Sequence, residues 1–207
     1  MNIYIENLLN RYPVLEDCAV DIERAFSLMS ECYRTGGKVM ICGNGGSAAD
    51  AEHWAGELMK GFLKKRSLST EIKRNFNPEL AENLQGALPT IPLTGFLSLT
   101  TAFANDVNSD FLFAQMVWGL GKENDILIGI STSGKSRNVL YALQTASALG
   151  MKTIGLSGRD GGAMVNMVDV CIRVPKTKVH QVQEYHLPVY HCLCMMLEEE
   201  FFPETTQ

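Results

Sequence analysis

The chain repeats one local arrangement: a short apolar run, a turn rich in glycine and serine, and then a helical pattern. The first turn spans residues 43–47 (GNGGS) and the second spans residues 131–136 (STSGKS). Short, nearly continuous apolar runs are typical of strands buried on both faces, and such strands form parallel sheets covered by helices. The sequence therefore predicts an α/β fold.

The rest of the chain extends this alternation of strands and helices. Apolar residues at helical spacing predict a helix over Ala19–Arg34, and helices are also expected at 48–60, up to Leu149, and at 180–201. Four strands are expected, at 38–42, 125–130, 152–157 and 168–174. We expect a single doubly wound parallel sheet with helices on both faces, a flavodoxin-like, Rossmann-type arrangement that holds no nucleotide.

Composition is ordinary for one soluble domain. The 207 residues are 46% hydrophobic, and no linker or low-complexity tract divides them. We therefore expect a single domain over residues 1–207, with an N-terminal helical extension and an inserted excursion near residues 63–90. Within the excursion, Asn77 and Pro78 predict the start of a short helix. A further helix is expected over Leu97–Ala104, ending at Asn105-Asp106.

Charge and cysteine usage exclude several classes of protein. The net charge is −5, and the only dense basic run, Lys64-Lys65-Arg66, is interpreted as a solvated loop, so a nucleic-acid partner is not expected. No apolar run is long enough for a membrane span, and the N-terminus lacks the pattern of a signal peptide. The six cysteines, including Cys42, Cys171 and Cys192 among apolar neighbours, indicate structural thiols in a reducing cytoplasm.

The two turns are candidate phosphate sites. Neither matches the Walker pattern or the dinucleotide fingerprint. Each nevertheless brings backbone N–H groups and hydroxyls to a helix N-terminus, where a phosphate can be held, and Ser47 is placed to cap the helix after the first turn. Either turn alone could be a plain strand-to-helix connection. Two in one domain favour a phosphorylated small molecule as the ligand.

Histidine and carboxylate side chains form a second group of candidates. His53 and Glu57 are four residues apart on a predicted helix and so share one face, which suits two metal ligands, an acid–base pair or an ordinary surface pair. Gln183 and His191 are eight apart, about 80° around a helix and about 12 Å along it, so spacing alone does not predict a shared metal. His186 between them is expected to pack in the helix–sheet interface.

Taken together, these motifs resemble the sugar isomerase (SIS) domain family and, within it, the phosphoheptose isomerases. The turn at 131–136 is typical of the wider family, whereas His53, Glu57 and His191 together are typical of the phosphoheptose isomerases. It covers most of the chain, from about Gly36 to Leu197. The matching segments are 42–47, 51–58, 105–106, 125–136, 158–162 and 183–191.

The resemblance implies a cytoplasmic homotetramer that converts D-sedoheptulose 7-phosphate to D-glycero-D-manno-heptose 7-phosphate through an enediol, for heptose and surface (lipo)polysaccharide synthesis. It implies Glu57 as the base, His191 as the acid, and one zinc ion held by His53, Glu57, Gln183 and His191. A tightly bound metal ligand is a poor proton shuttle, so the role of zinc stays open. The implied substrate contacts are Asn44, Gly45, Gly46, Ser47, Glu57, Asn105, Asp106, Ser131, Thr132, Ser133, Ser136 and Gln183.

The chain departs from the family pattern at three places. His180 stands where an aspartate is frequent, Gly56 where a second carboxylate is frequent, and residues 67–88 form a longer stretch than usual. Two alternatives remain at this point. One is a non-catalytic phosphosugar-binding regulator like the SIS protein that binds the replication initiator. Residues 192–203 resemble the tail of that protein, but that protein lacks a counterpart of His191. The other is an isomerase of a different phosphosugar.

Overall fold

A computed structural model describes residues 2–203, so positions 1 and 204–207 of the expected domain lie outside the described residues. Five parallel strands form one sheet in the order β2-β1-β3-β4-β5. This is the flavodoxin-like order, and it confirms the doubly wound α/β fold predicted from the sequence. The strands are β1 (Val39–Gly43), β2 (Thr90–Pro92), β3 (Ile126–Ser131), β4 (Lys152–Ser157) and β5 (Val170–Arg173).

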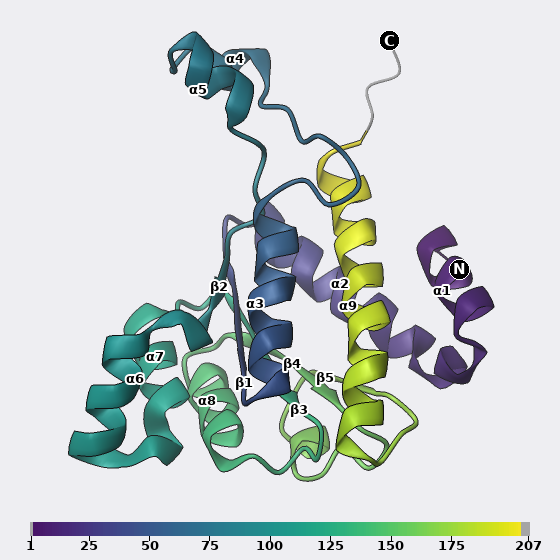
Figure 1. The fold of residues 1–207 in the computed structure, drawn as a ribbon, viewed down its shortest axis with the longest axis vertical. Coiled ribbons are helices and arrows are strands. Elements are labelled where there is room, and N and C mark those ends of the chain that lie inside the picture. Colours follow the sequence, from purple (N-terminus) through teal and green to yellow (C-terminus); the bar gives the residue numbers. More distant parts are fainter. Residues whose placement is uncertain (1, 204–207) are drawn as a thin grey trace.

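Helices cover both faces of the sheet (Figure 1). One core layer lies between the sheet and α1, α2, α3 and α9, and the other between the sheet and α7 and α8. Helices α3 and α9 contact each other along one face. The helices are α1 (Ile3–Arg11), α2 (Ala19–Arg34), α3 (Gly46–Met59), α4 (Thr70–Lys73), α5 (Pro78–Asn83), α6 (Leu97–Phe103), α7 (Leu112–Leu120), α8 (Arg137–Ala148) and α9 (Val179–Phe201).

The sheet topology places the two glycine- and serine-rich turns side by side. Strands β1 and β3 are neighbours, with Gly43 paired to Ile130 at their carboxyl ends. The chain leaves β1 toward one side of the sheet and leaves β3 toward the other, so this is the topological switch point. Ligands of open α/β sheets bind in the crevice at such a point.

Several boundaries differ from the sequence prediction. Five strands form where four were expected, because β2 has only three residues and contains Pro92, which gives it no strand signal. Helix α7 was also not predicted, because it is mostly apolar and has no polar face that would mark a helical pattern. Ser47 does not cap α3: the helix begins at Gly46, its N-cap residue is Gly45, and no side chain caps it.

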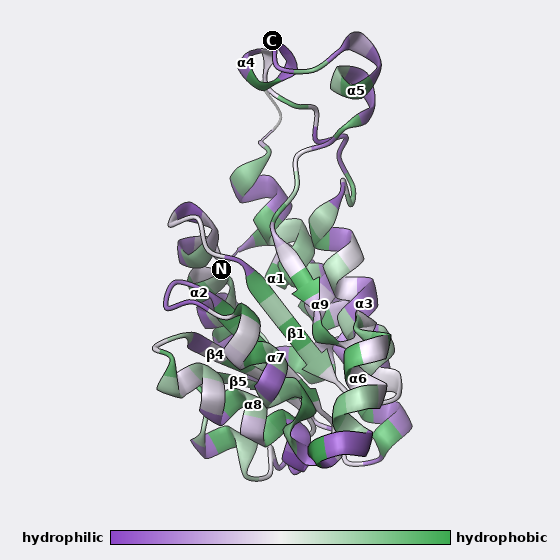
Figure 2. Cartoon of the chain, turned by 90° about the vertical axis from the view of Figure 1, so that its left-hand side faces the viewer, coloured by the Kyte–Doolittle hydropathy of each residue, from purple (hydrophilic) through white to green (hydrophobic). Residues whose placement is uncertain are grey.

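Residues 63–86, called the arm below, stand apart from the sheet in both ribbon views (Figures 1 and 2). As predicted, Asn77 caps α5 by accepting a hydrogen bond from the Leu80 N–H. Two segments enter and leave the arm, and they pair at its base through a single antiparallel bridge between Ser67 and Gln85. The arm is thus a local loop closed at its base.

Two further expectations concern thiols and membranes. All six cysteines are free and buried, as expected for structural thiols. Across residues 2–203, no helix has the length and apolar character that crossing a membrane requires.

Candidate active site

The first group of candidate residues, the turn cluster, lies at the carboxyl ends of β1 and β3. Gly45 adopts a φ of +55°, and Ser47 is buried in the first turn of α3. In the second turn the Ser131 and Ser136 hydroxyls are 2.9 Å apart, and the Ser157 hydroxyl donates to the Ser131 carbonyl at 2.7 Å. The hydroxyls are therefore ordered beside the N-termini of α3 and α8, where anions are stabilised.

A residue that the sequence analysis missed links the two turns. The Asn44 amide donates to the Asn138 side-chain oxygen at 2.9 Å, and the Asn138 amide donates back to Asn44 at 2.8 Å. Asn138 also accepts the backbone N–H of Val139 in the first turn of α8. Nothing in the spacing of Asn138 marks it, because the pairing depends on the register of β1 against β3.

The second turn depends on Gly134. Its φ is +62°, and a Cβ atom there would lie 1.9 Å from the Gly161 carbonyl oxygen. We expect Gly134→Ala to destabilise the protein by more than about 2 kcal/mol, from backbone strain plus this clash. Gly119→Ala is the matched control, since it adds a methyl group to a helix position with no atom within 4 Å. Urea unfolding of the two variants checks this, and equal stabilities would contradict it.

Next to the second turn, Thr132 and Ser133 line a cavity of about 150 Å³. Three cations and one carboxylate also line this cavity, namely Lys135, Arg159 and Lys176 with Asp160. Nothing local in the sequence marks Arg159 or Lys176, because they follow different strands and only the fold brings them together. A cavity with hydroxyls and three cations suits a phosphate group.

Gln183 joins the turn cluster from α9. A Cβ atom on Gly46 would lie 2.4 Å from the Gln183 side-chain nitrogen, so only glycine leaves room for this side chain. Gln183 therefore lies at the N-terminal end of α3, beside the turn cluster. Asn105 and Asp106 lie elsewhere, in an exposed π-helical segment after α6, where the Asn105 amide donates to the Asp106 carboxylate at 2.8 Å.

The second group, the histidine cluster, lies further along α3 and α9. His53 Nε2 is 3.2 Å from Glu57 Oε1, so the predicted shared face of α3 is present. Lys60 Nζ is 2.8 Å from the other Glu57 oxygen. The His191 ring on α9 lies edge to face against the His53 ring, with centroids 5.2 Å apart. Three of the candidate residues are thus together.

The electrostatics of the histidine cluster favour a carboxylate base beside a neutral imidazole. Burial raises the pKa of the Glu57 carboxyl, but Lys60 and His53 lower it by more than burial raises it. The pKa of Glu57 is therefore below its usual value. Burial and the neighbouring His53 lower the pKa of His191. At neutral pH, Glu57 can accept a proton, and His191 can donate a hydrogen bond from a neutral ring.

The turn cluster and the histidine cluster are separated within one chain. Ser47 and Glu57 are ten residues apart on α3, which is roughly 15 Å along the helix axis. Gln183 and His191 are similarly separated along α9. His186, between them, is fully buried in the helix–sheet interface, as expected, and burial lowers its pKa to about 4.

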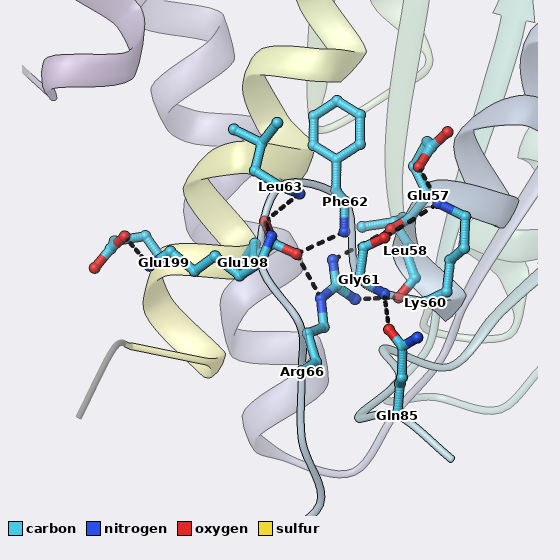
Figure 3. Close-up of polar contacts among 11 residues, drawn as sticks. Glu57, Leu58, Lys60, Gly61, Phe62, Leu63, Arg66, Gln85, Glu198 and Glu199 are labelled. Atoms are coloured by element: carbon cyan, nitrogen blue, oxygen red, sulfur yellow. Dashed lines mark hydrogen bonds and ion pairs between the residues drawn. The ribbon is translucent and has the colours of Figure 1, made fainter. Parts of the chain in front are cut away.

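The prediction that Lys64-Lys65-Arg66 form a solvated loop is wrong for Arg66. Arg66 is fully buried and forms an ion pair with buried Glu198 of α9, with 2.8 Å between Nε and Oε1 (Figure 3). The Arg66 guanidinium also donates to the backbone carbonyls of Glu57 and Leu58. The sequence around Glu198 does not reveal this pair, because Arg66 lies in a loop more than a hundred residues away.

The donor atoms of the histidine cluster suit zinc. In the described part of the chain, no three His, Cys, Asp or Glu side chains already form an arrangement that could hold a metal ion. However, His191 Nε2 is buried and has no hydrogen-bond partner, which leaves its lone pair or proton available. Imidazole nitrogens and a carboxylate are ordinary zinc ligands. His53, Glu57 and His191 therefore fit such an ion in chemical type, whereas Gln183 lies with the turns.

Comparisons with known proteins agree with this fold and these motifs. The SIS domain model matches residues 4–158. Phosphoheptose isomerase of Rhodospirillum rubrum is 42% identical over 89% of this chain and 88% of its own length, and that of Shewanella frigidimarina is 37% identical over 99% and 95%. A solved phosphoheptose isomerase from Francisella tularensis superposes with a TM-score of 0.78, at 35% identity over 96% of each chain.

The family model covers well over half of the chain, and the relatives match nearly its whole length. This confirms the resemblance on which the sequence analysis relied. The chain belongs to the SIS domain family and, within it, to the phosphoheptose isomerases.

Proposed function

We propose that the chain is an aldose–ketose isomerase that converts D-sedoheptulose 7-phosphate to D-glycero-D-manno-heptose 7-phosphate. The observation that carries the proposal is the Glu57 carboxylate, held by His53 and Lys60 in its ionised form next to His191. Its relatives' names support the same reaction class. The product would supply heptose for surface polysaccharide synthesis.

Isomerisation requires one proton to move between adjacent carbons. In the proposed mechanism Glu57 removes a proton from C1 of the ketose, which gives an enediol, and returns it to C2. A second proton moves from the hydroxyl on C1 to the oxygen on C2, which becomes a hydroxyl. A neutral His191 would donate a hydrogen bond to the oxygen that carries developing charge.

The turn cluster would hold the phosphate of the sugar. Hydroxyls of Ser131, Ser133 and Ser136, backbone N–H groups, and the cations around the adjacent cavity supply the donors for an anion. We propose that Asn44, Gly45, Gly46, Ser47, Thr132 and Gln183 contact the substrate as well, and that Asn105 and Asp106 contact it from their exposed segment.

Zinc is part of the proposal. His53, Glu57 and His191 would hold the ion, and Gln183, which lies about 12 Å along α9 from His191, would reach it only from a second copy of the chain. A bound zinc ion would supply a Lewis acid that polarises a carbonyl oxygen. Self-association is proposed too, as a homotetramer in the cytoplasm in which each chain is a single SIS unit. The roughly 15 Å along α3 between Ser47 and Glu57 supports it, because a second copy can bring the missing cluster to one substrate.

The test is an NMR assay over a panel of ketose phosphates that includes sedoheptulose 7-phosphate, with and without added Zn²⁺. We expect conversion of the seven-carbon sugar to its aldose at equal mass. Conversion of another phosphosugar alone would transfer the reaction to that substrate. Phosphosugar binding without conversion, together with tight binding to the replication initiator, would support a regulator instead.

A further inference from the structure

One buried guanidinium holds the end of helix α3 that carries Glu57. The last carbonyl groups of a helix have no partners inside it. Arg66 is 1% exposed, and its Nη1 and Nη2 donate to the carbonyls of Leu58 and Glu57 at 2.7 and 3.2 Å (Figure 3). The guanidinium therefore fixes the backbone from which the Glu57 carboxylate projects.

The other edge of the guanidinium is bound to α9. Arg66 Nε donates to Glu198 Oε1 at 2.8 Å, and the same oxygen accepts the backbone N–H of Phe62 at 2.7 Å. Glu198 follows His191 by seven residues, about two helical turns, so both lie on the same face of α9. One carboxylate of α9 thus anchors the end of α3 and the loop that follows it.

This loop makes two contacts with the histidine cluster. The Phe62 ring lies against the His191 ring, with centroids 5.1 Å apart and planes 46° apart. Lys60, which pairs with the Glu57 carboxylate, also donates from Nζ to the Gly61 carbonyl at 3.1 Å. A shift of the loop would therefore disturb both residues of the proposed mechanism.

We propose that Arg66 and Glu198 are positioning residues of the isomerisation. Arg66 fixes the end of α3 from which the Glu57 carboxylate projects. Glu198 fixes the loop that places Phe62 on His191. Neither Arg66 nor Glu198 touches the reacting atoms, since each is 1% exposed. The inference rests on the proposed function for the role of Glu57 as the base, and a misplacement of about 1 Å can cost such a group about 100-fold in rate.

The first test is Arg66→Lys in the full-length protein, assayed with sedoheptulose 7-phosphate. Lysine keeps the charge beside Glu198, but one ammonium lacks the planar fork that reaches a carboxylate and two helix carbonyls together. We expect kcat to fall about 10–100-fold. KM is expected to change only a few-fold, because the turn cluster lies at the other end of α3. Arg74→Lys, the same change at an exposed position of the arm, is the matched control and is expected to keep kcat.

A double variant separates positioning from stability. Arg66→Met/Glu198→Leu leaves no buried charge without its partner, but it removes the anchor of α3 and of the loop. Its kcat is expected to fall about as far as in Arg66→Lys, at a temperature where circular dichroism shows both variants folded. Lys64→Met/Glu199→Leu makes the same exchange at the neighbouring surface pair and is expected to keep kcat. Wild-type kcat in either folded variant of the buried pair, or a change confined to KM, overturns the proposal.

Crystal structures of the wild type and Arg66→Lys, in the same crystal form, give a readout that needs no sugar. With the sheets superposed, the Glu57 carboxylate is expected to move relative to the His191 ring by more than about 0.5 Å, the tolerance of a working site. An unmoved carboxylate would overturn the inference. A wild type that converts no sugar, together with a displaced carboxylate in Arg66→Lys, would overturn the proposed isomerisation but not the positioning of Glu57.

Discussion

Turnover of sedoheptulose 7-phosphate is expected to fall by roughly 10²–10⁴-fold in Glu57→Gln, because the amide keeps the shape of the side chain but cannot accept the proton from carbon. His53 and Lys60 lower the carboxyl pKa, so the wild-type group is ionised and ready to act as a base at neutral pH. The measurement is kcat by NMR or by a coupled assay.

Binding separates this role from simple damage to the site. The turn cluster that would hold the phosphate is roughly 15 Å from Glu57 along α3, so phosphosugar affinity is expected to change by only a few-fold. Glu52→Gln makes the same chemical change at an exposed position of α3 and is expected to keep full activity. Metal content is measured in parallel, because Glu57 is also a proposed zinc ligand. Activity retained in Glu57→Gln would remove this residue from the role of base.

Removal of the Glu198 carboxylate is expected to destabilise the fold by about 3–5 kcal/mol, the usual cost of leaving a buried charge without its partner. Arg66 and Glu198 are both almost fully buried, and Glu198 also accepts the backbone N–H groups of Phe62, Leu63 and Lys64 (Figure 3). Glu198→Ala therefore leaves Arg66 uncompensated and three backbone donors unsatisfied.

Glu199→Ala is the matched control for this effect. Glu199 is the next residue of α9, and its ion pair with Lys64 lies at the surface, so its loss is expected to cost far less stability than the loss of Glu198. Urea unfolding measures both variants. The double variant Arg66→Met/Glu198→Leu should recover part of the loss, because it removes both buried charges together. Similar stabilities for Glu198→Ala and Glu199→Ala would show that the buried ion pair stabilises the fold no more than the surface pair does.

Local sequence patterns were sufficient to predict much of the fold. The Ala19–Arg34 helix and the Lys152–Ser157 strand have the predicted bounds, because glycines follow the helix and flank the strand, and apolar spacing marks their type. The contact between His53 and Glu57 also follows from spacing alone, since residues four apart share a helix face. Such features depend on neighbours in the chain.

The features that were missed depend on distant residues. Strand β2 has only three residues, and it forms because they pair with the edge of β1. Arg66 looked like part of a solvated basic run, and only Glu198, more than a hundred residues later, explains its burial. Asn138 carries no local signal either, because its partner lies on another element. Sequence periodicity contains no information about such pairings.

Closure of the arm at its base has a consequence for how this chain can vary. Gln85 accepts the Gly61 N–H, the Gly86 N–H donates to the Arg66 carbonyl, and Ser67 bridges Gln85. These contacts return the chain to the body of the protein immediately beside its point of departure (Figure 1). Segments can therefore be shortened, lengthened or replaced between Leu68 and Leu84 without a change in the path of α3. The arm is a natural place for evolutionary insertion, and for grafting a foreign peptide or a reporter domain in the laboratory.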